Sequence, residues 1–151
     1  MSARLAVLGI AIVASAALFA CHGGEASPAA PAAAAGHRIV IEVNVEGPER
    51  WEAILNNVEN LQKALGADKT QVEVVAHAKG LGLLLATNDA LRARMQEEHE
   101  KGVVFAACEN TMRKQNVTKE QLLPFAVTVD SGVAGGVRKQ EAGWAYLKGG
   151  G

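Results

Sequence analysis

Residues 102–108 read Gly-Val-Val-Phe-Ala-Ala-Cys, an apolar run that suits a buried strand, and a short polar segment, 109–115, follows it as a helix. The same alternation recurs along the chain, where apolar runs are separated by segments with helical spacing. Nearly continuous apolar strands joined by helices predict one α/β domain at residues 37–148, with three α/β/α layers around a mainly parallel sheet. The other strands are expected at 37–45, 71–77 and 125–129, and the other helices at 48–65, 83–85, 89–101 and 131–147.

Composition limits the functions open to the chain. Its 151 residues hold 15 Lys and Arg against 16 Asp and Glu, a formal net charge of −1. This balance gives neither the basic surface that nucleic-acid binding needs nor a polybasic patch for an anionic membrane. Aromatic residues make up only 4%, so a base-stacking platform is not expected. Two cysteines and four histidines without metal-ligand spacing predict no metal site, and no motif indicates a cofactor.

The N-terminal part of the chain has the pattern of a bacterial export signal. Residues 1–20 have a short basic start and then a charge-free apolar run that is too short to span a bilayer. The run ends in Leu18-Phe19-Ala20-Cys21, which resembles the lipobox of bacterial lipoproteins. Cleavage at Ala14-Ser15-Ala16 is the alternative and would release a soluble periplasmic protein. We favour lipidation at Cys21, which predicts a periplasmic protein anchored by lipid alone, with an Ala/Pro-rich tether at 21–36.

Polar or reactive side chains stand where three of the expected strands end, at Asn44, His77 and Cys108. In open parallel sheets, ligands gather at this edge. Cys108 also directly precedes a helix, and the N–H groups at a helix start favour a thiolate over a thiol. Arg113 would add positive charge, whereas Glu109 would oppose it. From composition alone, however, a cysteine after an apolar strand is more often a small buried hydrophobe.

Several segments together resemble the DsrE/DsrF-like family in their order and spacing. They are the strand 72–77 with its glycine turn, the segment 102–112, the closing residues 141–146, and the helix that begins near Trp51. The resemblance implies a layered α/β/α fold and assembly into homo- or hetero-oligomers. It also implies a function, because the best-understood branch of the family relays sulfane sulfur on a cysteine between strand and helix, where Cys108 stands. That branch is cytoplasmic, whereas this chain has an export signal.

These observations predict an exported, sulfurtransferase-like protein that carries sulfane sulfur as a persulfide on Cys108. Supporting roles are expected for His77, Asn44, Asn110 and Arg113, and the partner is a sulfur donor or acceptor protein or a small thiol. The alternative is a non-enzymatic periplasmic module that binds a small ligand or a protein, with Cys108 structural. A thiol redox sensor is disfavoured, because the chain offers no well-placed resolving cysteine.

The end of the domain suggests self-association. Trp144 and Tyr146, expected on the last helix, are rare aromatic residues in this chain, and such residues often anchor subunit contacts. Packing against the domain's own sheet is an equally good interpretation of both side chains. Together with the family resemblance, they predict a homo-oligomer.

Overall fold

The computed structural model of the chain describes residues 36–150. The expected signal segment at 1–20, Cys21 and the tether up to residue 35 lie outside the described residues. Strands and α-helices alternate within the described part: β1 (His37–Val43), α1 (Pro48–Leu65), β2 (Thr70–Ala76), α2 (Asp89–Glu100), β3 (Val104–Cys108), α3 (Glu109–Gln115), β4 (Val127–Val129), α4 (Gly132–Glu141) and β5 (Ala145–Gly149). Short 3-10 turns join them at η1 (Ala67–Lys69), η2 (Ala78–Leu84) and η3 (Lys119–Gln121).

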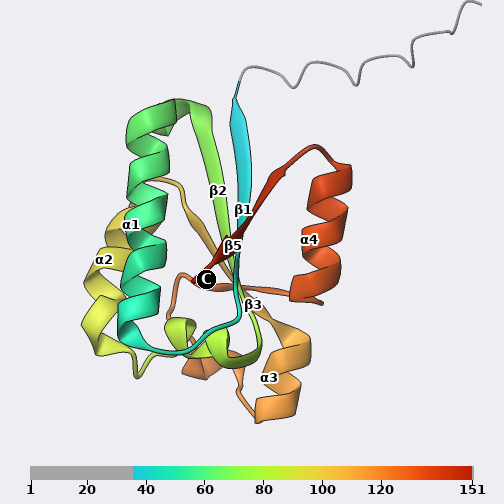
Figure 1. Cartoon of the computed structure of the whole chain (residues 1–151). Helices are drawn as coiled ribbons and strands as arrows, with labels where there is room; N and C mark the ends of the chain where they lie inside the picture. The colour runs from blue at the N-terminus through green and yellow to red at the C-terminus, as the bar shows by residue number, and fades with distance from the viewer. Residues whose placement is uncertain (1–35, 151) are drawn as a thin grey trace, which may run out of the picture. The chain divides into compact units, whose positions relative to one another are not determined.

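The strands form one parallel sheet in the order β4-β3-β2-β1-β5. The chain moves outward from β1 to β4 and then returns to the other side of β1 for β5. When all crossovers between parallel strands are right-handed, the connections that lead toward one edge of the sheet lie on one face, and the connections that lead back toward the other edge lie on the opposite face. Accordingly, α1 and α2 cover one face and α4 covers the other (Figure 1). This arrangement confirms the predicted three-layer α/β/α fold.

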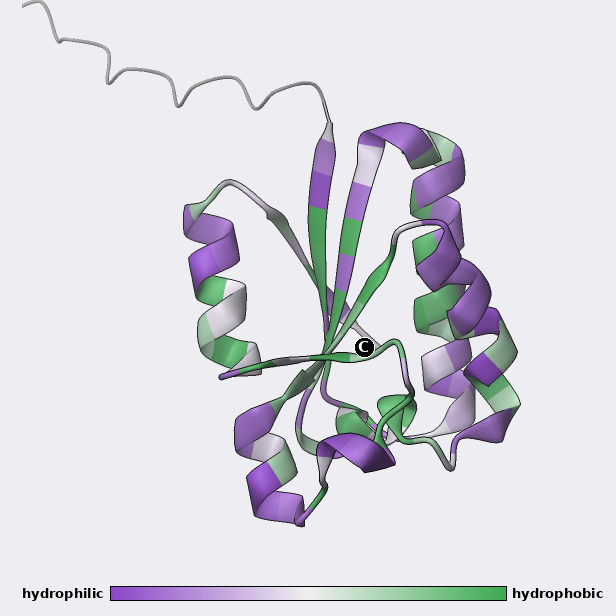
Figure 2. Ribbon diagram, turned by 180° about the vertical axis from the view of Figure 1, so that it is seen from behind, coloured by the Kyte–Doolittle hydropathy of each residue, from purple (hydrophilic) through white to green (hydrophobic). Residues whose placement is uncertain are grey.

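The hydrophobic cores on the two faces of the sheet differ in size. On the side of α1 and α2, buried side chains of the first three strands pack against α1 residues such as Ile54, Leu55 and Val58. On the side of α4, the buried cluster consists of Val40, Val75 and Ala106, with a few partly buried neighbours. Figure 2 shows hydrophobic residues along parts of the central strands and a mixture of hydrophilic and hydrophobic residues along α1 and α2. The face under α4 is therefore the thinly covered side of the sheet.

The last helix is shorter than the sequence predicted. We expected it to reach Leu147, but α4 ends at Glu141, and residues 145–149 form β5 alongside β1. Gly143 has φ of +83°, a left-handed conformation that ends a helix and that glycine adopts without strain. The following residues then pair with the free edge of β1, where Tyr146 lies opposite Val40. Strand pairing thus decides the structure of a segment whose apolar residues also fit a helix.

Two other elements differ in extent. The strand expected at 125–129 begins only at Val127, because Phe125 turns into the core, stacks on His99 at 5.2 Å between ring centroids and meets the edge of Phe105 at 5.8 Å. The short helix expected at 83–85 is part of a longer 3-10 stretch, η2, that starts directly after His77.

Candidate functional site

Cys108, the last residue of β3, is buried, with 4% of its surface exposed. The polar groups that can hydrogen-bond to its sulfur are the N–H groups of Gly132, Thr111 and Asn110 and the side chain of Thr111. Burial raises the pKa of the Cys108 thiol, but these polar groups together outweigh burial and hold the pKa below its ordinary value. The surroundings of Cys108 therefore favour an anionic sulfur.

Local contacts fix the donors around this sulfur. The Thr111 hydroxyl accepts a hydrogen bond from the N–H of Ala78 at 3.0 Å, which leaves its own proton for Cys108. Gln115 donates to the carbonyl of Ala78 at 2.8 Å and so ties α3 to the turn after β2. On the other side, the Ser131 hydroxyl caps α4 by accepting from the N–H of Ala134 at 3.3 Å. Both helix starts are thus held against the strand ends.

Gly132 brings α4 close to the sheet. A Cβ at this position would lie 3.2 Å from Cγ1 of Val75 and 3.3 Å from both Cβ and Cδ2 of His77. Such distances are tighter than an ordinary van der Waals contact, so a side chain here would push α4 away. The lack of a side chain allows the Gly132 N–H to reach Cys108.

A second polar group is centred on Glu42 of β1. Its Oε1 contacts Nε2 of His77 and accepts from the side chain of Asn44 at 3.4 Å, and its Oε2 accepts from the hydroxyl of Tyr146. The Glu42 side chain is 18% exposed, and a carboxylate so far from water needs such partners. Residues from β1, β5 and the end of β2 therefore form one connected polar network.

This network adjoins Cys108. The ladder between β2 and β3 pairs Ala76 with Ala107, so His77 and Cys108 come next in register, on the face that Val75 and Ala106 share. Gly132 relates to both groups, because its N–H helps to lower the pKa of Cys108 and a Cβ at this position would lie 3.3 Å from Cδ2 of the His77 ring. The strand ends thus place His77 and Cys108 at neighbouring positions on the carboxyl edge of the sheet.

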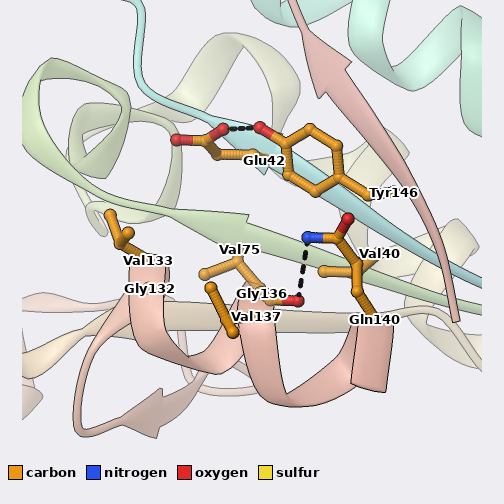
Figure 3. Close-up of a pocket in the computed structure, with 9 residues that line it drawn as sticks. All are labelled: Val40, Glu42, Val75, Gly132, Val133, Gly136, Val137, Gln140 and Tyr146. Atoms are coloured by element: carbon orange, nitrogen blue, oxygen red, sulfur yellow. Dashed lines mark hydrogen bonds between the residues drawn. The ribbon is translucent and has the colours of Figure 1, made fainter. Parts of the chain in front are cut away.

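A cavity of about 150 Å³, here called the α4 hollow, lies between α4 and the sheet. It is lined by Val40, Glu42, Val75, Gly132, Val133, Gly136, Val137, Gln140 and Tyr146 (Figure 3). Apolar side chains form most of its wall, and Glu42 and Tyr146 meet on the sheet side. None of these lining residues is basic. Cys108 does not line the hollow, but Gly132 belongs to both.

The remaining predicted site residues fall into two groups. Asn110 contributes its N–H to Cys108, and Asn44 acts on Glu42. Arg113 is directed elsewhere: its Nη1 lies 3.8 Å from Oε2 of Glu109, and its Nη2 donates to the side chain of Asn110. The charge of Arg113 is therefore offset by Glu109, which sequence reasoning had treated as an opponent of the thiolate.

Four residues of the site were not foreseen. Glu42 had a signal in the sequence, because it is a carboxylate inside an apolar strand, where an acid needs a partner. Thr111, Gly132 and Tyr146 had none, because their importance comes from strands and helices that meet only in the fold.

The described residues also bear on metal binding and membrane insertion. Between residues 36 and 150, no group of three or more His, Cys, Asp or Glu side chains is arranged to hold a metal ion. Over the same range, no helix combines the length and the hydrophobicity that crossing a membrane requires.

No model of a known protein family matches the chain, and no curated protein does so either. Among solved structures, MTH1491 from Methanobacterium thermoautotrophicum, a protein of unknown function, is 32% identical, with a TM-score of 0.70. The match covers 74% of this chain and 98% of MTH1491. The chain belongs to the MTH1491 family. Because nearly all of MTH1491 is covered, a whole domain is shared. The MTH1491 relationship assigns no activity, so the chemistry rests on the residues around Cys108.

Proposed function

We propose that this protein is an exported, DsrE/DsrF-like carrier of sulfane sulfur, and that Cys108 holds this sulfur as a persulfide. One observation carries the proposal: Cys108 is the last residue of β3 and directly precedes α3, and polar groups from the starts of α3 and α4 lower the pKa of its thiol although the side chain is buried. Donors in this arrangement stabilise the thiolate that attacks a sulfur donor, and they also suit the persulfide anion that results.

The transfer is a thiol exchange. The Cys108 thiolate attacks the outer sulfur of a donor R–S–SH, so that a new S–S bond forms and the S–S bond of the donor breaks. The electron pair leaves with R–S⁻, which takes up the proton and departs as R–SH, and Cys108 remains as a persulfide anion. An acceptor thiolate, on a partner protein or a small thiol, then takes the outer sulfur in the same way.

The neighbouring residues have distinct roles in this scheme. Gly132, Thr111 and Asn110 supply the polar groups that favour the anionic sulfur. His77 is the side chain in register with Cys108, and Glu42 fixes its ring by binding Nε2. Asn44 acts one step further away, on the carboxylate of Glu42.

The test is the mass of the peptide that contains Cys108 after exposure of the full-length protein to polysulfide. We expect a gain of one sulfur that is lost in Cys108→Ser, whose side chain has nearly the same size. Reading the peptide separates Cys108 from Cys21, the other cysteine of the chain. A Cys108 peptide of unchanged mass under conditions that load free cysteine would overturn the proposal.

The burial of Cys108 favours a second candidate, a periplasmic ligand-binding module in which this thiol is structural. Iodoacetamide separates the two. The carrier requires Cys108 to react in the folded protein, whereas a structural thiol reacts only after denaturation.

The proposal includes export and lipid anchoring. We expect the mature chain to begin at Cys21 and to carry diacylglycerol on that residue, because the Leu18-Phe19-Ala20-Cys21 junction resembles a lipobox. Globomycin, which blocks the lipoprotein signal peptidase, should make the precursor accumulate. A mature N-terminus at another residue would end the lipoprotein assignment and leave export standing.

A further inference from the structure

The lining of the α4 hollow combines apolar side chains with one carboxylate and lacks basic side chains. Valine side chains from both the sheet and α4 line it, and its ionisable residues are Glu42 and Tyr146. The cationic side chains of α4 serve the other flank of that helix, where Lys139 pairs with Glu73 at 2.7 Å and Arg138 pairs with Asp130. A molecule in the hollow therefore meets apolar walls and a carboxylate, and no positive side chain of the lining offsets an added negative charge.

The size of the hollow limits what can enter. Its volume of about 150 Å³ equals that of an engineered protein cavity that binds benzene, so a molecule of about six heavy atoms fits. Cys108, with 4% of its surface exposed, is likewise out of reach of a bulky donor. Both observations favour a small molecule over a protein-bound sulfur.

The hollow is also linked to Cys108. Gly132 forms part of its wall and packs against His77, and its N–H is one of the polar groups that lower the pKa of Cys108. Glu42, on the opposite wall, binds the ring of His77, which is in register with Cys108. Two lining residues, Glu42 and Gly132, therefore adjoin His77, whose neighbour in register on β3 is Cys108.

We propose that the α4 hollow binds the sulfur donor, and that this donor is a small hydropersulfide with an uncharged or amine-bearing body. The inference rests on the proposed function of Cys108 and specifies its substrate class. Anionic donors, including thiosulfate and carboxylate-bearing hydropersulfides, are disfavoured, because they would bring a second negative charge next to Glu42. The reaction is the balanced exchange given above, in which R–S–SH becomes R–SH as Cys108 gains one sulfur.

Three probes of nearly equal size test the charge preference: the hydropersulfides of cysteamine, 2-mercaptoethanol and thioglycolate. Each loading rate is measured on the full-length protein from the Cys108 peptide and divided by the rate for free cysteine, which removes intrinsic reactivity. We expect the ammonium and hydroxyl probes to load Cys108 at least tenfold faster than the carboxylate probe. In Glu42→Gln this preference should fall to about twofold or less.

Two glycine variants test the location. Gly136 lines the hollow and a Cβ there would meet nothing within 4 Å, so Gly136→Val adds bulk to the hollow at a position with open space for the new Cβ. Gly135 is the matched control, because it neighbours Gly136 on the same helix, lies outside the hollow and has only the flexible end of Arg138 at 4.0 Å. Loading by the ammonium and hydroxyl probes should slow at least fivefold in Gly136→Val and change by less than twofold in Gly135→Val.

The possible failures are distinguishable. If none of the three probes loads Cys108, the proposed function fails, and this inference fails with it. If all three load Cys108 at equal normalised rates, or if Gly136→Val behaves like Gly135→Val, the persulfide carrier stands and the donor site in the α4 hollow is overturned. Circular dichroism and urea unfolding of both variants verify that a slow rate reflects a filled hollow in a folded protein.

Discussion

At the scale of single residues, Gly132 is the position of the site at which an added side chain has the least room. We predict that Gly132→Ala raises the pKa of Cys108 and slows its alkylation at neutral pH several-fold. The added Cβ would lie 3.2–3.3 Å from side-chain atoms of Val75 and His77, and we expect the start of α4 to shift by a few tenths of an ångström, which weakens the effect of its N–H on the sulfur. The measurement is the rate of iodoacetamide modification of the Cys108 peptide as a function of pH.

Gly136→Ala is the control for this experiment, because it makes the same substitution in the same helix with open space around the new Cβ. It should keep the pKa of Cys108 and should gain some stability from the higher helix propensity of alanine. An alkylation profile of Gly132→Ala that coincides with the wild-type profile would show that the Gly132 N–H does not govern the thiol.

At the scale of elements, the sequence predicted what depends on local pattern and missed what depends on pairing across the fold. The strands that end at Ala76 and Cys108 were recognisable because burial on both faces makes them apolar throughout. The strand 145–149 was mistaken for helix, because its partner is an edge of β1 more than a hundred residues earlier. No local periodicity records such a partner.

The same distinction holds for the site. Cys108 and His77 could be found from the sequence, because each comes at the end of an apolar strand and parallel strands gather their ends at one edge. The Glu42–Tyr146 contact joins residues 104 positions apart, and the Gly132 N–H meets the sulfur only when α4 crosses to the far face of the sheet. Contacts of this kind become visible only in three dimensions.

A substitution at Gly143 tests whether this residue ends α4. Its φ of +83° is costly for any residue with a side chain, and a Cβ there would also lie 3.3 Å from Nη2 of Arg38. We predict that Gly143→Ala lowers the free energy of unfolding by roughly 1–2 kcal/mol. Gly135→Ala, inside the same helix and with ordinary φ, should instead gain up to about 1 kcal/mol. Urea unfolding of both variants measures the difference, and equal stabilities would contradict the assignment of Gly143 as the helix stop.

At the scale of the whole molecule, the side chains that cover the α4 face of the sheet bear on whether the protein self-associates. Trp144 packs against the Val40 cluster and has Lys139 4.0 Å from its ring centroid, and the Tyr146 hydroxyl is bound to Glu42. The two aromatic residues expected to anchor a subunit contact thus make contacts within the domain. Exposed apolar surface remains on α4, where Val133 and Val137 are 63% and 50% exposed.

We therefore predict a homo-oligomer for the fragment that starts at His37, with α4 at the contact. Light scattering at micromolar concentration should give a mass above that of one chain. Replacing Val133 and Val137 by Lys should give the monomer, because two charges would have to be buried at the contact. Val127→Lys, on the edge strand β4 and 45% exposed, is the control and should leave the mass unchanged. A monomeric wild-type fragment would contradict the prediction.

The stability of the folded chain should also depend on the ionisation of Cys108. Its pKa in the fold is lowered, whereas the unfolded chain has the ordinary value near 8.5. Between these two values the unfolded state binds more protons than the native state, so the free energy of unfolding rises with pH. The contribution is fully present above about pH 8.5 and is lost as the pH falls through the lowered pKa of Cys108.

Cys108→Ser isolates this contribution, because it removes the titrating group and leaves the other ionisable residues in place. We predict that the stability of the wild type relative to Cys108→Ser increases as the pH rises through the lowered pKa of Cys108 and levels off above about pH 8.5. Urea unfolding under reducing conditions, at several pH values, gives this difference. A difference that falls as the pH rises would mean that burial dominates and that the native thiol stays neutral. Cys108 would then lack the anionic sulfur on which persulfide transfer depends.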